Sequence, residues 1–247
     1  MGSTRASNGT GRDRQTDARR LLVLWDIDAT LLRAGPLGRA IYGAAFARAT
    51  GQSMRVQGST SGRLDTDIYR DTLLAHELDP AAHPFPAFAS ALSAEYEAHA
   101  AELSEHGRAL PGAADALEAV AREPHVVQTV LTGNLRSVAR VKLTAVGLAR
   151  HLDLAIGAYA EDAETRAGLV PVARTRAGVR HGAEFAAAST VLVGDSRHDV
   201  AAGRAAGVRV IAVATGQDGA GVLAEGADVV LDDLSDTAAV LSALLSG

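Results

Sequence analysis

Two aspartates with one residue between them directly follow a short apolar run near the start of the chain. The run is Leu21–Trp25, and the aspartates are Asp26 and Asp28. Buried parallel strands are typically short, continuous apolar runs, and ligands bind at the carboxyl edge of open α/β sheets. Two like charges buried side by side need a cation or a proton to compensate them. The pair therefore indicates a metal-assisted site, with an acidic turn after a strand as the simpler alternative.

A second acidic pair follows a later apolar run, residues 190–193. Asp195 and Asp199 are four residues apart, so a helix that begins here would place both carboxylates near one face. Together with Asp26 they would supply the hard oxygen ligands that Mg²⁺ prefers. The alternative is that Asp195 caps this helix while Asp199 lies in its first turn, where a negative charge is favourable.

A polar segment and two cations complete the set of candidate residues. Thr132, Gly133 and Asn134 follow another apolar run, and a hydroxyl with free backbone N–H groups at a helix start can bind phosphate. Thr and Asn are, however, also ordinary helix caps. Arg166 precedes a predicted helix, and Lys142 is the only lysine among the 24 Lys and Arg residues. Either cation could neutralise phosphate and carboxylates, or be a solvated surface charge.

The elements that must position these residues alternate between strands and helices. Apolar runs predict strands at residues 21–25, 126–131, 152–156, 190–193, 208–213 and 228–231. Helical patterns lie at residues 136–146, 170–179, 199–206 and 236–245. Gly147, Gly178 and Gly207 are predicted to end helices. The alternation predicts an α/β fold, a Rossmann-like doubly wound parallel sheet with helices on both faces.

About a hundred residues separate the first two predicted strands, far more than one crossover needs. Helical patterns fill this stretch at residues 37–49, 67–78 and 87–105. We therefore expect a helical cap at residues 35–107, inserted in a core of residues 20–34 and 108–247. Such a cap would cover the carboxyl edge of the sheet and exclude water, unless it is only a helical layer. Residues 1–19 are polar and aperiodic and are predicted to be a disordered leader.

The composition fits an ordinary globular protein and excludes several classes of function. Hydrophobic residues make up 47% and charged residues 21% of the 247 residues. A net charge of -5 argues against a broad nucleic-acid surface. The absence of cysteine excludes disulfides and cysteine nucleophiles, and no apolar stretch approaches the ~20 residues that cross a membrane. We expect a cytoplasmic protein; the oligomeric state stays open.

Taken in order, these segments resemble the haloacid dehalogenase-like (HAD) hydrolase superfamily. The order is a strand followed by DxDxT, a helical insert, a strand followed by TGN, a cation, and a strand followed by GDSxxD. The resemblance covers nearly all of residues 20–247, and the tail segments Val213–Gly216 and Gly226–Leu231 are similar to the phosphoglycolate phosphatase-like branch. It implies a Mg²⁺-dependent phosphatase acting on a small phosphorylated substrate such as phosphoglycolate or a sugar phosphate.

The resemblance also implies roles for the acidic residues. Asp26 would attack phosphorus and become an aspartyl phosphate, which splits one hard displacement into two easier ones. Asp28 would protonate the leaving oxygen and then deprotonate the hydrolytic water. Mg²⁺ would be held by Asp26, Asp195, Asp199 and a backbone carbonyl at Asp28, and would offset the repulsion between nucleophile and phosphate.

Phosphate binding is implied for the polar segment and the cations. Its implied members are Thr132, Gly133, Asn134, Arg166 and Lys142. Of the two cations we favour Arg166, because the family usually has a lysine at that point of the chain. Within the insert, Gly62-Arg63-Leu64-Asp65 resembles a substrate-facing cap turn, where Arg63 and Asp65 would contact the substrate.

Two departures from the family pattern leave alternatives open. Arg166 replaces the usual lysine, and Ala29 replaces the usual glycine after the second aspartate. If that position requires a positive φ, the added methyl carries a steric cost. The alternatives to a phosphatase are a phosphomutase, which shares the core residues, and a non-catalytic phosphometabolite-binding protein. A dehalogenase is disfavoured, because displacement at carbon needs neither Asp28 nor a metal-binding Asp195.

Overall fold

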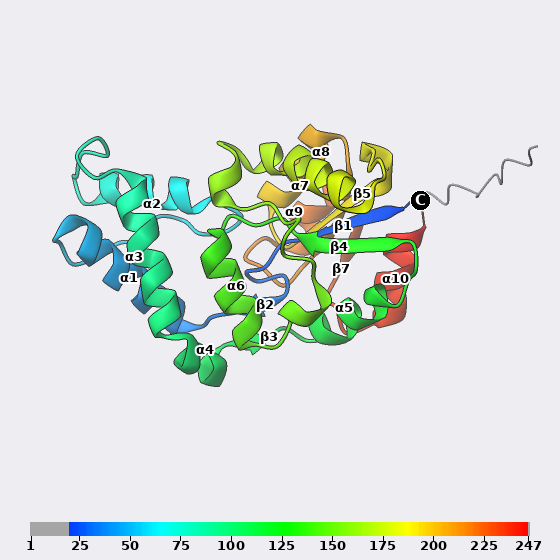
Figure 1. Ribbon diagram of the computed structural model, residues 1–247, viewed down its shortest axis with the longest axis horizontal. Coiled ribbons are helices and arrows are strands. Elements are labelled where there is room, and N and C mark those ends of the chain that lie inside the picture. Colours follow the sequence, from blue (N-terminus) through cyan, green and yellow to red (C-terminus); the bar gives the residue numbers. More distant parts are fainter. Residues whose placement is uncertain (1–19, 247) are drawn as a thin grey trace, which may run out of the picture.

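A parallel five-stranded sheet lies at the centre of the protein, with strand order β4-β1-β5-β6-β7 (Figure 1). The computed structural model describes residues 20–246. The strands are β1 (Leu21–Trp25), β4 (Val126–Val130), β5 (Thr190–Gly194), β6 (Arg209–Val213) and β7 (Val229–Leu231). All neighbouring pairs are parallel, which confirms the predicted α/β fold. The predicted leader, residues 1–19, lies outside the described residues.

The central strand β1 is buried on both faces. Leu22 and Leu24 belong to an apolar cluster with α7 (Arg166–His181) and α8 (Arg197–Ala206). Val23 and Trp25 belong to another cluster, with α5 (Ala113–Ala121) and α10 (Thr237–Leu245). Successive side chains of a strand point to opposite faces, so helices cover both faces of the sheet. This two-sided burial explains why the strand is a continuous apolar run rather than an alternating one.

The register of the sheet brings three chain segments to one edge. Trp25, the last residue of β1, is paired with Val130 of β4 and with Val193 of β5. Because the strands are parallel, the residues that follow all three leave the sheet at its carboxyl edge. The three polar motifs of the sequence therefore converge there.

Four of the five helices between β1 and β4 in the sequence lie to one side of the sheet in space (Figure 1). They are α1 (Pro36–Thr50), α2 (Asp65–Ala75), α3 (Phe85–Ala98) and α4 (Ala100–His106). They share a separate apolar cluster, in which the Tyr69 and Phe88 rings stack with centroids 4.2 Å apart. Leu135 and Val138, at the start of α6 (Arg136–Ala145), join this cluster. Helix α6 thus lies between the helical cap and the core.

The chain passes between core and cap through a short antiparallel pair of strands. β2 (Leu32–Arg33) follows the first acidic motif, and β3 (Arg108–Ala109) follows α4. Neither strand was expected from the sequence, because each is only two residues long. The pairing holds the outgoing and returning segments side by side.

The predicted strand at residues 152–156 is wrong. This segment forms turns: the Asp153 carboxylate accepts a hydrogen bond from the Ala155 N–H at 3.1 Å, and the Leu154 N–H donates to the Leu152 carbonyl. Such local bonds compete with a sheet ladder. The chain still follows β4 loosely, through an isolated parallel bridge between Leu131 and Ala158.

Two helix boundaries also differ from expectation. Gly178 does not end a helix, since α7 continues to His181 and ends at Gly182, which has a φ of 60°. The single helix expected at residues 87–105 is two helices, α3 and α4, that meet at His99. Gly147 and Gly207 do follow helix ends with positive φ, as predicted.

The remaining elements are short. They are α9 (Ala220–Ala224) and the 3₁₀ turns η1 (Ala149–His151), η2 (Ala160–Asp162) and η3 (Ala187–Ser189). Within residues 20–246, none of the helices combines the length and apolar character needed to span a membrane.

Candidate active site

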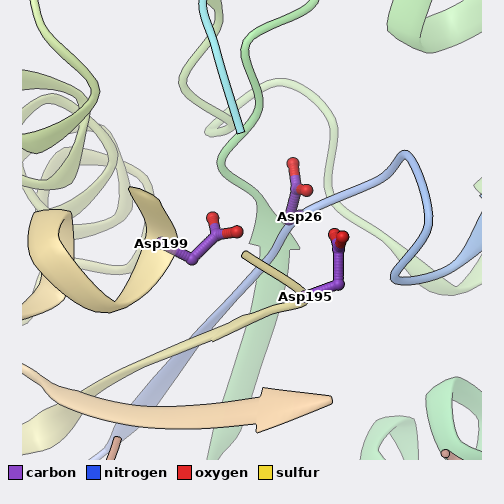
Figure 2. A group of neighbouring side chains, drawn as sticks. All are labelled: Asp26, Asp195 and Asp199. Atoms are coloured by element: carbon purple, nitrogen blue, oxygen red, sulfur yellow. The ribbon is translucent and has the colours of Figure 1, made fainter. Parts of the chain in front are cut away.

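Three aspartates converge at the carboxyl edge of the sheet (Figure 2). Asp26 follows β1, Asp195 follows β5, and Asp199 lies in the first turn of α8. Each offers a carboxylate oxygen, and these oxygens all lie within 4.8 Å of one another. All three residues are buried. The fold therefore concentrates negative charge that requires compensation.

The backbone around these aspartates is held closely. The Asp26 N–H donates to the Val193 carbonyl at 2.8 Å, which continues the pairing of β1 with β5 past the last strand residue. A Cβ atom at Gly194 would lie 2.2 Å from Asp199 Cγ, and one at Gly216 would lie 2.0 Å from Asp195 Oδ2. Only glycine permits this approach at residues 194 and 216.

Ser196, rather than Asp195, is the N-cap of α8. Its hydroxyl accepts a hydrogen bond from the Asp199 N–H at 3.2 Å. In return Asp199 Oδ2 accepts from the Ser196 N–H and hydroxyl, at 3.1 and 2.6 Å. This reciprocal capping box fixes the Asp199 side chain. The structure thus places Asp199 in the first helical turn, as the simpler alternative expected, and leaves Asp195 free of a capping role.

Arg166 is the cation of this cluster. It is the first residue of α7, whose N-cap Thr165 accepts from the Gly168 N–H. Its Nη2 lies 2.7 Å from Asp26 Oδ1 and 2.5 Å from Asp199 Oδ1, and its Nε donates to the same Asp199 oxygen at 2.8 Å. Its Nη1 makes no hydrogen bond to a described residue, so donors remain for a ligand.

Charge is undercompensated at Asp26 and Asp195. Burial raises the pKa of Asp26; Asp199 and Asp28 raise it further against the lowering effect of Arg166. Burial, then the Asp26 and Asp199 carboxylates, raise the pKa of Asp195. A divalent cation would compensate the negative charge of these buried carboxylates, and carboxylate oxygens are ligands that Mg²⁺ prefers. Among described residues, Asp26 Oδ2 and Asp195 Oδ2 accept no hydrogen bond, so the donor set fits such an ion.

Asp199 is less open to a metal ion than the other two aspartates. Its Oδ1 accepts from Arg166, and its Oδ2 accepts from Ser196. Within the described part of the chain, the Asp195 side chain accepts only through Oδ1, from the Thr30 hydroxyl at 3.0 Å. Direct ligation by Asp199 would displace bonds that fix α8 and Arg166.

Asp28 belongs to a second polar group, beside the three aspartates. Its Oδ1 and Oδ2 lie 2.9 and 2.7 Å from Lys142 Nζ, and Asn134 Nδ2 donates to Oδ2 at 2.6 Å. Withdrawal from water acts to raise the pKa of Asp28, but the Lys142 charge and the bonds from Lys142 and Asn134 outweigh it and lower the pKa. Lys142 is buried on α6 and is not the surface charge that the sequence allowed.

The segment after β4 joins the two groups. Thr132 is fully buried, and its hydroxyl oxygen accepts from the Asn134 N–H and Nδ2, at 3.2 and 2.9 Å. Gly133 faces the cap: a Cβ atom there would lie 1.9 Å from the Arg63 carbonyl oxygen. Thr132, Gly133 and Asn134 therefore lie between the sheet edge and the cap.

The cap residues Arg63 and Asp65 occupy different surroundings. Arg63 forms an ion pair with Asp71 at 2.8 Å. Asp65 is buried, and its Oδ2 accepts from the Leu135 N–H at 2.9 Å while its own N–H donates to the Gly133 carbonyl at 2.8 Å. Burial raises the pKa of Asp65 to about 6. Asp65 thus joins the cap to the core.

A cavity of about 450 Å³ unites these residues beneath the cap. Its wall includes the acidic residues Asp26, Asp28 and Asp195, the cations Lys142 and Arg166, and the segment Thr132–Asn134. The sequence reasoning missed Arg33, Arg39, Tyr42 and Tyr96, which also line it. No local motif marks these residues: Arg39 and Tyr42 reach the cavity from α1, Tyr96 from α3 and Arg33 from β2.

Ala29, which stands where the family usually has glycine, does adopt a positive φ. Its φ is 63°, a region that L residues with a Cβ seldom adopt. The turn is held in place, since the Ala29 N–H donates to the Leu32 carbonyl at 2.9 Å and the Ala29 carbonyl accepts from the Thr215 hydroxyl at 2.6 Å. The glycine-favouring conformation is kept despite the methyl group.

A parallel α/β core with an aspartate cluster at its carboxyl edge, beneath a helical insert, defines a class of capped hydrolases. The family model for haloacid dehalogenase-like hydrolases matches residues 23–204, and the chain belongs to this family. It is accordingly a hydrolase of the haloacid dehalogenase-like family. No curated protein matches the chain significantly.

Solved structures share the fold at low sequence identity. CbbY from Rhodobacter sphaeroides, in complex with phosphate, is 22% identical, with a TM-score of 0.66 over 88% of this chain and 96% of that one. A hydrolase from Pseudomonas syringae is 19% identical, with a TM-score of 0.62 over 90% and 98%. A protein from Haemophilus somnus, described as a predicted phosphoglycolate phosphatase, is 17% identical, with a TM-score of 0.62 over 91% and 99%.

Proposed function

We propose that the protein is a Mg²⁺-dependent phosphatase that hydrolyses a small phosphorylated metabolite through an aspartyl phosphate on Asp26. The observation that carries this proposal is the convergence of Asp26, Asp195 and Arg166 on the floor of the capped cavity. A nucleophilic carboxylate, a metal-binding partner and a guanidinium suit the three needs of phosphoryl transfer: attack, charge compensation and positioning.

The first half of the reaction forms the covalent intermediate. A carboxylate oxygen of Asp26 attacks phosphorus, and the bond from phosphorus to the leaving oxygen breaks. Asp28 first takes up a proton from solvent, against the lowering of its pKa by Lys142 and Asn134, and gives that proton to the leaving oxygen, so the product leaves as an alcohol. Arg166, which contacts Asp26 Oδ1 and retains free N–H groups, would orient the nucleophile and bind phosphoryl oxygens.

The second half restores the enzyme. Asp28, now a carboxylate, takes a proton from water as the water oxygen attacks phosphorus. The bond between phosphorus and Asp26 breaks, and inorganic phosphate leaves with the Asp26 carboxylate regenerated. Thr132 and the backbone of Gly133 and Asn134 would bind the transferring group through both halves. The side chain of Asp28 is 46% exposed, toward the lined cavity, which supports this double use.

A magnesium ion held by Asp26, Asp195 and the backbone carbonyl of Asp28 would supply positive charge against the repulsion between carboxylate and phosphate. We assign Asp199 to holding Arg166 and α8 rather than to direct ligation, because both of its oxygens are engaged.

For the substrate class we propose phosphoglycolate or a sugar phosphate. The cavity of about 450 Å³ accommodates a small metabolite, and Arg33, Arg39 and Arg63 line it. A CbbY structure from Rhodobacter sphaeroides holds xylulose-1,5-bisphosphate, and this fold relative supports a sugar phosphate.

The test is phosphate release by the purified protein from a panel of phosphorylated metabolites and p-nitrophenyl phosphate, with Mg²⁺ present. Asp26→Asn should abolish turnover, because an amide does not attack phosphorus. Release of free phosphate, rather than an isomerised sugar phosphate, separates the phosphatase from a phosphomutase. Absence of turnover on every substrate would favour a binding protein instead.

A further inference from the structure

The buried ammonium of Lys142 has no donor left for a substrate. A lysine ammonium has three N–H donors. In this protein they face three acceptors within hydrogen-bond distance: Asp28 Oδ1 at 2.9 Å, Asp28 Oδ2 at 2.7 Å and Asn134 Oδ1 at 2.7 Å. Binding a phosphoryl oxygen through Lys142 would require one of these bonds to break.

Arg166 contrasts with Lys142 in this respect. Arg166 uses Nε and Nη2 for Asp26 and Asp199 and keeps Nη1 free of described partners. The two buried cations are therefore not equivalent: Arg166 contacts the nucleophile with donors to spare, and Lys142 contacts only the group around Asp28.

Asp28 is held from one side and open on the other. Both of its oxygens accept from Lys142, and Oδ2 also accepts from Asn134, yet its side chain remains 46% exposed. The network extends further. Asn134 Nδ2 also donates to the Thr132 hydroxyl oxygen. The ring centroid of Tyr96, on the cap, lies 5.4 Å from Lys142 Nζ. An aspartate in a loop is thereby fixed to the rigid helix α6.

We infer that Lys142 is a positioning residue, which holds the Asp28 carboxylate toward the leaving oxygen of the substrate and does not bind the transferring phosphate. This inference rests on the proposed function, because it concerns the proton transfer that the function assigns to Asp28. Lys142 itself gives up no proton and forms no bond to the substrate.

Leaving-group dependence tests the inference. Phenyl phosphate and p-nitrophenyl phosphate have similar shapes, but phenolate is the poorer leaving group and needs a proton more. The value of kcat/KM reports only the steps up to alcohol release, so it isolates this proton transfer from the later hydrolysis. Lys142→Met should lower kcat/KM for phenyl phosphate about tenfold more than for p-nitrophenyl phosphate, a part of the full effect of a general acid.

Two matched variants accompany this measurement. Arg140→Met removes an exposed cation from the same helix, one that pairs with Glu97 at 3.6 Å. It should leave kcat/KM for both substrates within about twofold of the wild-type values. Arg166→Ala should lower kcat/KM for both substrates by similar factors, because it acts on the nucleophile and phosphoryl group. If Lys142→Met does not fold, Lys142→Gln enters the same comparison.

A double-mutant cycle supplies the second readout. If Lys142 acts through Asp28, Lys142→Met should lower kcat/KM by less than about twofold in an Asp28→Asn background, since the effects of coupled residues are not additive. Three results for Lys142→Met would each overturn the inference: equal losses of kcat/KM for the two substrates, weaker inhibition by inorganic phosphate than in the wild type, or a full further loss of kcat/KM in the Asp28→Asn background. A wild-type protein inactive on both substrates with Mg²⁺ would refute the proposed function instead.

Discussion

The guanidinium of Arg166 donates twice to a single oxygen of Asp199, through Nε at 2.8 Å and Nη2 at 2.5 Å. The same Nη2 also lies 2.7 Å from Asp26 Oδ1. One side chain at a helix start therefore bridges the proposed nucleophile and the first turn of α8. A lysine at this place would contact the same oxygens as a point charge, without the fixed fork of arginine.

Removing this bridge should destabilise the protein as well as inactivate it. Arg166→Ala leaves Asp199 and Asp26 buried without their cation, so we expect a loss of about 3 kcal/mol in the free energy of unfolding at neutral pH without metal. Urea denaturation measures it. Arg174→Ala is the control on the same helix, because among residues 20–246 Arg174 donates only to the Phe185 carbonyl. Equal losses in the two variants would show that the ion pairs contribute nothing specific.

The positive φ of Ala29 predicts a stabilising substitution. Ala29→Gly should raise the free energy of unfolding by about 0.5–1 kcal/mol, because the left-handed conformation strains a Cβ by more than glycine loses in chain entropy. Ala44→Gly, within α1, should have the opposite sign, since glycine costs up to about 1 kcal/mol in a helix interior. Thermal and urea denaturation of both variants test this; a destabilised Ala29→Gly protein would contradict it.

Asp65 should make stability depend on pH between about 4 and 6. Its pKa is raised from 3.8 to about 6 by burial, so the folded state binds its proton more tightly than the unfolded state does. Its contribution to stability is therefore complete below pH 3.8 and is lost as pH rises through about 6. Asp65→Asn keeps an acceptor for the Leu135 N–H but does not titrate.

The measurement compares wild type with Asp65→Asn by urea denaturation at about pH 3.5 and about pH 7, on the two sides of this window. The stability of the wild type relative to the variant should fall as pH rises. All other titrating groups are common to both proteins, so they cancel in the difference. A relative stability that rises with pH would mean that Asp65 is not held in its neutral form by burial.

Mg²⁺ should stabilise the folded protein through Asp195. Burial, and after it the neighbouring carboxylates, raise the pKa values of Asp26 and Asp195. A cation would favour the charged form of both, and an ion present at a hundred times its Kd adds about 2.7 kcal/mol. Thermal unfolding with Mg²⁺ and with EDTA measures this shift. Asp195→Asn should abolish the shift, whereas Asp153→Asn, in the turn after η1, should keep it. A shift that survives Asp195→Asn would place the ion elsewhere.

Local patterns carried the prediction of the sheet and of its acidic edge. The run Leu21–Trp25 and the acidic residues after it could be recognised because two-sided burial makes a strand uniformly apolar. The same reasoning failed at residues 152–156, where four of the five residues are apolar, because the side chain of Asp153 bonds to the backbone two residues ahead. The capping of α8 was misassigned to Asp195 as one alternative; the spacing of Ser196 and Asp199 was the signal for it.

The environment of each cation was beyond the sequence. Lys142 and Asp28 are separated by 114 positions, and the packing of α6 against the core, beside β1, brings them together. Likewise, Arg39 and Tyr96 reach the cavity from α1 and α3, helices whose faces the pattern of residues did not resolve. Residue types predicted which chemistry is present, but tertiary packing decides which cation meets which carboxylate.

The two hydrogen bonds between Asp65 and the Gly133–Leu135 backbone tie the first turn of α2 to the loop after β4. Any swing of the insert away from the sheet must first rupture these bonds and uncover a carboxylate that now sits in a dry environment. If the insert moves to let substrate enter or product leave, that motion acts on the Gly133–Leu135 backbone, part of which would bind the phosphoryl oxygens. Opening of the cap and binding of the phosphoryl group would therefore be coupled through the same backbone segment.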